Sequence, residues 1–137
     1  MTRAALSRRA VLAGLAALAA GQGRAAGSPA VGLILVGASW CPVCKDAAPV
    51  VALAAQRLQC PVLVASHDNR PIPPFPAMVP AAGHPIAGAI TTLPTTLVWV
   101  RAEDRIAGRI AGYRDAGRFL ADLARILDAA GAGDAGR

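Results

Sequence analysis

The pattern of hydrophobic and polar residues in the first half of the chain predicts a strand, a helix and a second strand. Residues 31–36 form a continuous apolar run of strand length, which is typical of a strand buried on both faces of a sheet. From Pro42 to Gln59 apolar residues recur at helical spacing, and Pro49, which interrupts the pattern, should kink the helix. The apolar run 61–65 predicts the second strand. A helix between two strands predicts that the strands pair in parallel.

The second half of the chain predicts a hairpin and a final helix. Residues 95–101 and 105–111 are β-rich runs separated by three residues, which favours an antiparallel pair. Asp115 is a candidate N-cap, and an apolar stripe at helical spacing follows it as far as Gly131. The order of the predicted elements is strand, helix, strand, irregular segment, strand, strand and helix, which is an α/β arrangement.

The irregular segment, residues 66–94, is rich in proline. The prolines at positions 71, 73, 74, 76 and 80 predict an extended surface loop, because proline has no N–H group to donate within a helix. A short helical piece around residues 81–90 would fit the rest of the segment. The proline-rich loop 71–80 is also a candidate for selecting a partner.

Charge is concentrated at the N-terminus. The 137-residue chain has a formal net charge of +6, yet residues 1–30 contain four arginines and no acidic residue. The remainder carries ten basic and eight acidic side chains, without a basic run. The charge therefore argues against binding to nucleic acid.

The same N-terminal residues predict an export signal. Arg8 and Arg9 precede the small and apolar run 10–20, as in the twin-arginine motif. The run has the length of a signal h-region and is too short to span a bilayer of about 30 Å. We predict a twin-arginine signal peptide over residues 1–27, a domain over residues 28–137 and a periplasmic location. A disordered alanine-rich tail on a cytosolic protein is the alternative.

Two cysteines lie where the first predicted strand gives way to the first predicted helix. On an α-helix, Cα atoms three residues apart are about 5 Å from each other, within the range of about 4.4–6.8 Å that a disulfide needs. Cys41 and Cys44 can therefore form and break a disulfide with little backbone movement. Pro42 suits the first helical turn, whose unpaired N–H groups favour a thiolate at Cys41. We predict that Cys41 attacks and that Cys44, one turn further in, resolves.

These elements and motifs resemble the thioredoxin family over about residues 30–130. The Cys-Pro-Val-Cys form is similar to that of periplasmic thioredoxin-like proteins. The residues that match the family pattern are Trp40 before the first cysteine, Lys45 after the second, Pro49, the tripeptide Leu93-Pro94-Thr95 and Gly112. The resemblance implies a minimal thioredoxin fold, with a four-stranded mixed sheet flanked by helices, and a thiol:disulfide oxidoreductase that needs no cofactor and no metal.

The resemblance also implies where a protein client binds. Pro94 would be cis, its loop would lie against Cys41, and Leu93 would pair with the client backbone as a strand does. An ordinary trans proline at the start of a strand is the alternative. The implied substrate-binding residues are Trp40, Pro42, Leu93, Pro94 and Thr95, with Trp40 shielding one edge of the cysteine pair.

The chain departs from the thioredoxin pattern at Leu35, where thioredoxins carry a buried aspartate that helps to deprotonate the resolving cysteine. Val43 also lacks the charge of the histidine found in strongly oxidising relatives. We therefore expect an intermediate reduction potential and favour the reducing direction, with a membrane electron donor as the second partner.

Two other functions remain open. Cys41 and Cys44 could belong to a copper or zinc carrier completed by Cys60, His67 or His84, although one C-x-x-C pair supplies only two ligands. The domain could also be a docking subunit without catalysis. We expect Cys60 to be a buried apolar residue, with a regulatory thiol as the alternative. We expect His67 and Asp68 to lie in a solvated loop at the same sheet edge as Cys41, with a role in proton transfer as the alternative.

Overall fold

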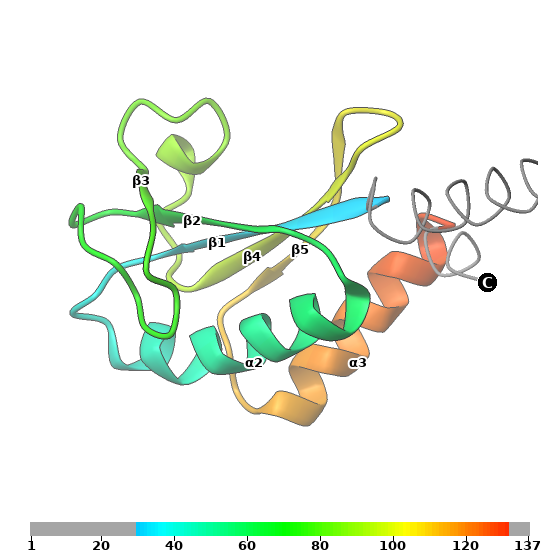
Figure 1. The fold of residues 1–137 in the computed structure, drawn as a ribbon, viewed down its shortest axis with the longest axis horizontal. Helices are drawn as coiled ribbons and strands as arrows, with labels where there is room; N and C mark the ends of the chain where they lie inside the picture. Colours follow the sequence, from blue (N-terminus) through cyan, green and yellow to red (C-terminus); the bar gives the residue numbers. More distant parts are fainter. Residues whose placement is uncertain (1–29, 132–137) are drawn as a thin grey trace, which may run out of the picture.

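The described part of the chain, residues 30–131 of the computed structural model, is organised around one mixed β-sheet (Figure 1). In chain order its strands are β1 (Val31–Gly37), β2 (Val62–Ser66), β3 (Val79–Pro80), β4 (Thr95–Val100) and β5 (Arg105–Ala111). The order across the sheet is β3-β2-β1-β4-β5. β2 is parallel to β1 and β3, whereas β4 is antiparallel to β1 and β5. The predicted signal peptide lies outside the described residues.

The sheet has one strand more than the four expected, and the additional strand is β3. Val79 pairs with Ala65 and Pro80 with Ser66, and the N–H of Ala81 donates to the carbonyl of Ser66 at 2.8 Å. Because β3 lies at the edge of the sheet, proline can stand in it without breaking a central ladder. The proline-rich segment is thus an irregular loop over residues 67–78 that ends in a strand. The helical piece expected after it is the single 3₁₀ turn η1 (Ala87–Ala89).

Helix α2 (Pro42–Leu58) follows β1, with Pro42 in its first turn as predicted. The helix continues past Pro49, so this proline does not end it. It stops before Gln59, whose φ of 52° is left-handed and whose N–H donates to the last turn. The expected boundary is therefore correct to within one residue.

Helix α3 (Ala116–Ala129) closes the fold. The side chain of Asp115 accepts the N–H of Arg118 at 2.8 Å, which confirms the predicted N-cap. Gly131 follows the helix with a φ of 73°, a conformation that glycine adopts without strain. Over residues 30–131, neither helix has the length and hydrophobicity that crossing a membrane requires.

Both helices pack on the same face of the sheet, below it in Figure 1. Every residue of β1 is buried, which agrees with the continuous apolar run that predicts this strand. Alternate β1 side chains belong to different clusters. Leu33 and Leu35 join the cluster that contains α2 and α3 residues, while Ile34 and Val36 join a smaller one with Ala81 and others from the segment before β4.

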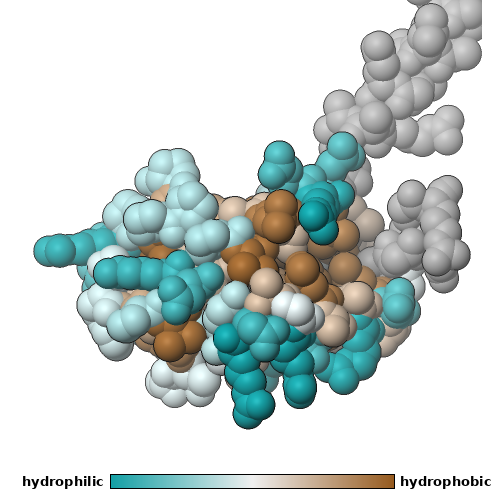
Figure 2. Space-filling model, turned by 90° about the horizontal axis from the view of Figure 1, so that it is seen from below, coloured by the Kyte–Doolittle hydropathy of each residue, from teal (hydrophilic) through white to brown (hydrophobic). Residues whose placement is uncertain are grey.

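The helical side of the molecule keeps some apolar surface. The exposed hydrophobic residues of α2 are Val43, Leu53 and Leu58. Figure 2 looks at this side from below and shows hydrophobic surface between hydrophilic areas. Val43 stands between the two cysteines, so its exposure places apolar surface directly beside them.

Candidate active site

The two cysteines lie at the junction of β1 and α2, where the sequence predicts them. Cys41 is the N-cap of α2 in an extended conformation, and its Sγ accepts the N–H of Cys44 at 3.2 Å. Cys41 is 6% exposed and Cys44 is 0% exposed. The sulfur at the helix N-terminus is therefore the more accessible one, as an attacking Cys41 and a resolving Cys44 require.

Burial governs the chemistry of Cys44. It raises the pKa of this thiol to about 12, because a thiolate is poorly solvated inside the protein. A hydrogen bond with Cys41 adds to the increase, and a backbone hydrogen bond from Ala38 opposes it. At neutral pH Cys44 is therefore a protonated thiol, which becomes nucleophilic only when its proton is removed.

Gly37, the last residue of β1, leaves the space in which Cys44 lies. A Cβ atom at this position would be 3.1 Å from Cys44 Sγ and 3.0 Å from Ile72 Cδ1. Cys44 and Ile72 thus pack against the same point of the β1 backbone. Ile72 comes from the proline-rich loop, and sequence analysis did not select it, because an isolated apolar residue among prolines carries no periodic signal.

The peptide bond between Leu93 and Pro94 is cis, as the resemblance to thioredoxins implies. Leu93 packs against the small cluster that contains Cys41 and Cys44, so the loop before β4 lies beside both cysteines. The carbonyl of Pro94 accepts the N–H of Gly112 at 2.7 Å, which ties this loop to the end of β5. The structure therefore brings together the two halves of the motif that are far apart in sequence.

The other expected substrate-binding residues differ in exposure. Thr95 is buried, and its Oγ1 donates to the carbonyl of Thr92 at 2.6 Å, so its side chain is not available to a client. Trp40, which directly precedes Cys41, is 66% exposed and forms open apolar surface. Pro42, which directly follows Cys41, is exposed, and Leu93 is half-buried.

Asp68 anchors the loop that precedes the cysteines. Its carboxylate accepts the N–H of Ser39 at 3.1 Å, the hydroxyl of Ser39, and the hydroxyl of the buried Ser66 at 2.7 Å. These bonds hold the pKa of Asp68 well below its usual range, because they stabilise the charged carboxylate. His67 is exposed, as expected for a solvated loop, whereas the half-buried Asp68 also links the end of β2 to the loop before Cys41.

The residues considered as further metal ligands do not gather around the cysteines. His67 Nε2 lies 2.9 Å from the carbonyl of Ile90, and His84 Nδ1 accepts the N–H of Ala87 at 3.0 Å. Cys60 is half-buried against the main core, where burial raises the pKa of its thiol. Among residues 30–131 no three His, Cys, Asp or Glu side chains are placed to hold a metal ion together.

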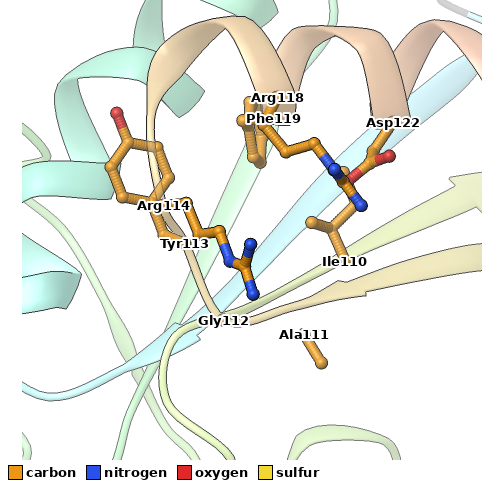
Figure 3. A pocket seen from close by; sticks show the side chains of 8 residues that line it. All are labelled: Ile110, Ala111, Gly112, Tyr113, Arg114, Arg118, Phe119 and Asp122. Atoms are coloured by element: carbon orange, nitrogen blue, oxygen red, sulfur yellow. The ribbon is translucent and has the colours of Figure 1, made fainter.

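A polar cavity of about 230 Å³ lies between the end of β5 and the start of α3 (Figure 3). Tyr113 and Phe119 line this cavity, and the centroids of their rings are 6.3 Å apart. Arg118 and Asp122 also line it, with Arg118 Nε 3.5 Å from Asp122 Oδ2. Figure 3 also shows the guanidinium group of Arg114 directed into it. No cysteine lines this cavity, so it is separate from the cysteine pair.

A Cys-x-x-Cys pair at the start of a helix, with a cis proline beside it on a thioredoxin fold, is the active-site architecture of thioredoxin-like thiol–disulfide oxidoreductases. More particularly, the chain belongs to the family described as TraF, F plasmid transfer operon protein, whose model matches residues 25–111. No curated protein sequence matches the chain significantly.

Solved structures share the fold. A protein of Chlorobium tepidum assigned as the thiol:disulfide interchange protein DsbE has a TM-score of 0.55 at 17% identity, covering 74% of this chain and 80% of that one. The dsbF structure from MTB, in mixed oxidized and reduced forms, has a TM-score of 0.52 at 13% identity, covering 72% and 81%. A thio-disulfide isomerase from Thermus thermophilus has a TM-score of 0.51 at 24% identity, covering 69% and 78%.

Proposed function

We propose that the chain is a periplasmic thiol:disulfide oxidoreductase that exchanges a Cys41–Cys44 disulfide with a protein client. The observation that carries the proposal is the arrangement of the two sulfurs. The more accessible Cys41 caps α2, the completely buried Cys44 donates its N–H to the Cys41 sulfur at 3.2 Å, and Leu93, which precedes cis-Pro94, packs against them. No cofactor is required for this chemistry.

The exchange takes place in two steps. The Cys41 thiolate attacks one sulfur of a client disulfide, a mixed disulfide forms, and the other client sulfur leaves as a thiolate that takes up a proton. Cys44 then loses its proton and attacks the Cys41 sulfur, so that the Cys41–Cys44 disulfide forms and the second client thiol leaves with a proton. The client gains two electrons, and the cysteine pair loses them.

The client is proposed to bind across the exposed surface around Cys41. The backbone of Leu93 would pair with an extended client peptide, and Trp40, Pro42 and Val43 would offer apolar contacts. We place the reaction in the reducing direction, serving a client such as a cytochrome or another redox enzyme during its maturation. A membrane electron donor would then return the pair to the dithiol form.

Insulin reduction by the purified protein tests this function. With dithiothreitol as the electron source, the protein is expected to accelerate cleavage of the insulin disulfides, and to oxidise a reduced peptide more slowly. Metal analysis of the same preparation is the control for a carrier function. About one copper or zinc ion per chain, together with no acceleration of insulin cleavage, would contradict the proposal.

Export tests the proposed location. Replacement of Arg8 and Arg9 by lysine is expected to leave the full-length protein in the cytoplasm, since a twin-arginine signal depends on both guanidinium groups. Fractionation of the cells, followed by detection of the protein, measures this. Arg3 to lysine is the matched control, because it lies before the motif and should not alter export. A periplasmic location of the double variant would argue against a twin-arginine signal.

A further inference from the structure

Ile72 is the one completely buried residue of the loop that joins β2 to β3, residues 67–78. Prolines precede and follow it, and each fixes its own backbone φ and lacks an N–H group. The loop therefore presents stiff, exposed backbone on both sides of a single inward-facing apolar side chain. The burial of Ile72 therefore fixes the position of this loop relative to the core.

Hydrogen bonds hold both ends of this loop at the edge of the sheet that carries the cysteines. The N–H of His67 donates to the carbonyl of Gly37 at 2.9 Å, and the N–H of Arg70 donates to Ser66 Oγ at 3.2 Å. At the other end, the N–H of Ala81 donates to the carbonyl of Ser66 at 2.8 Å. The loop thus starts beside the last residue of β1 and returns to the end of β2.

The Ile72 side chain and the Cys44 thiol converge on Gly37. The ideal Cβ position of Gly37 lies 3.0 Å from Ile72 Cδ1 and 3.1 Å from Cys44 Sγ, so both atoms lie against the same side of this glycine. Ile72 otherwise belongs to the main core cluster, and Cys44 to the small cluster around Cys41. Ala38, Cys41 and Leu93 surround Cys44 in a small apolar cluster. Within the described part of the chain, no carboxylate or amine contributes to the raised pKa of Cys44, which is caused mainly by burial.

We propose that Ile72 is a positioning residue that sets the rate of the second exchange step, because it closes off the resolving thiol from solvent. This inference rests on the proposed function, in which Cys44 resolves the mixed disulfide. In that step the Cys44 sulfur bonds to Cys41, the bond between Cys41 and the client breaks, and the Cys44 proton passes to the departing client sulfur. Ile72 keeps water, the other proton acceptor, away from Cys44 and so prolongs the mixed disulfide.

Alkylation of Cys44 tests the inference without any client. In a full-length background with Cys41→Ser and Cys60→Ser, Cys44 is the only thiol, since the chain has three cysteines. Its reaction with iodoacetamide is followed from pH 7 to pH 11. Ile72→Ala is expected to increase the rate at pH 8 by about tenfold, because one unit of pKa changes the thiolate population tenfold. The rate–pH profile should shift by about one pH unit towards lower pH over this range.

Two further variants test whether the change in the alkylation rate of Cys44 is specific to Ile72. Ile72→Val removes only Cδ1, the atom beside Gly37, and should produce a smaller increase in the same direction while keeping the fold. Ile110→Ala is the matched control, because Ile110 is also a buried isoleucine of the main core but belongs to β5. It should leave the alkylation rate within about twofold of the background, since it does not open the site around Cys44.

Failure of this inference and failure of the proposed function can be told apart. If both Ile72 variants alkylate at the background rate, or if Ile110→Ala accelerates the reaction as much as Ile72→Ala, Ile72 has no specific role. If the unsubstituted protein reduces no insulin, the proposed exchange function is wrong. The second exchange step, whose rate Ile72 is proposed to set, then does not take place. If the protein reduces insulin and the Ile72 variants alkylate faster than the background, Ile72→Ala should also shorten the lifetime of the mixed disulfide formed through Cys41.

Discussion

Replacing Cys44 by alanine is expected to leave the protein covalently joined to its client through Cys41. The first exchange step needs only Cys41, which caps α2 and is the more accessible sulfur. The second step needs the Cys44 sulfur, so without it the mixed disulfide accumulates and insulin reduction falls by about a thousandfold or more, as for loss of a catalytic nucleophile. Non-reducing electrophoresis of periplasmic extracts, followed by identification of the trapped protein, measures the result.

Cys41→Ala provides the decisive comparison. This variant should lose insulin reduction to the same extent but form no covalent complex, because Cys44 is completely buried and protonated at neutral pH. Cys60→Ala should behave like the unsubstituted protein, since Cys60 lies in the main core rather than in the cluster around Cys41. Equal trapping by the Cys41 and Cys44 variants would show that the two roles are assigned wrongly.

Replacing Gly37 by alanine is expected to lower both the stability and the activity of the protein. The new Cβ would stand 3.0 Å from Ile72 Cδ1 and 3.1 Å from Cys44 Sγ, closer than ordinary packing allows. Overpacking of this kind typically costs about 1–3 kcal/mol of unfolding free energy. Part of the strain is relieved by moving the Cys44 sulfur, so insulin reduction should fall as well. Urea unfolding and the insulin assay on the same preparation measure the two effects.

A second substitution and a control glycine test the cause. Ile72→Val removes the nearest atom, so the double variant with Gly37→Ala should recover part of the lost stability. Gly117→Ala is the control, because the nearest atom to its Cβ would be 3.4 Å away and alanine is the better helix former in α3. It should be neutral or slightly stabilising. Wild-type stability of Gly37→Ala would mean that Cys44 does not pack as described.

Short-range chemistry explains why the cysteine site could be predicted. Pro42 fits the first turn of a helix, Cys41 stands before it, and an apolar strand precedes both, so the local order of residues already places the pair at a helix N-terminus. The cis geometry of Pro94 came from the resemblance to thioredoxins and not from the residues alone. The structure confirms it.

Contacts between distant segments explain what was missed. Asp68 binds Ser39, 29 positions earlier, and its role as an anchor depends on the parallel pairing that brings the ends of β1 and β2 together. Strand β3 exists only because the proline-rich loop returns to the free edge of β2. Neither contact has a periodicity or a motif that could be recognised along the chain.

The sequence by itself determined the order of the main elements and the position of Cys41 and Cys44 at a helix N-terminus, because both depend on side-chain patterns and helix-start chemistry within a few residues. Only the tertiary structure decided what surrounds Cys44. Its burial against Gly37 and Ile72 is a property of packing, and the way a loop folds back over a sheet is set by the sum of many weak contacts rather than by its own residues.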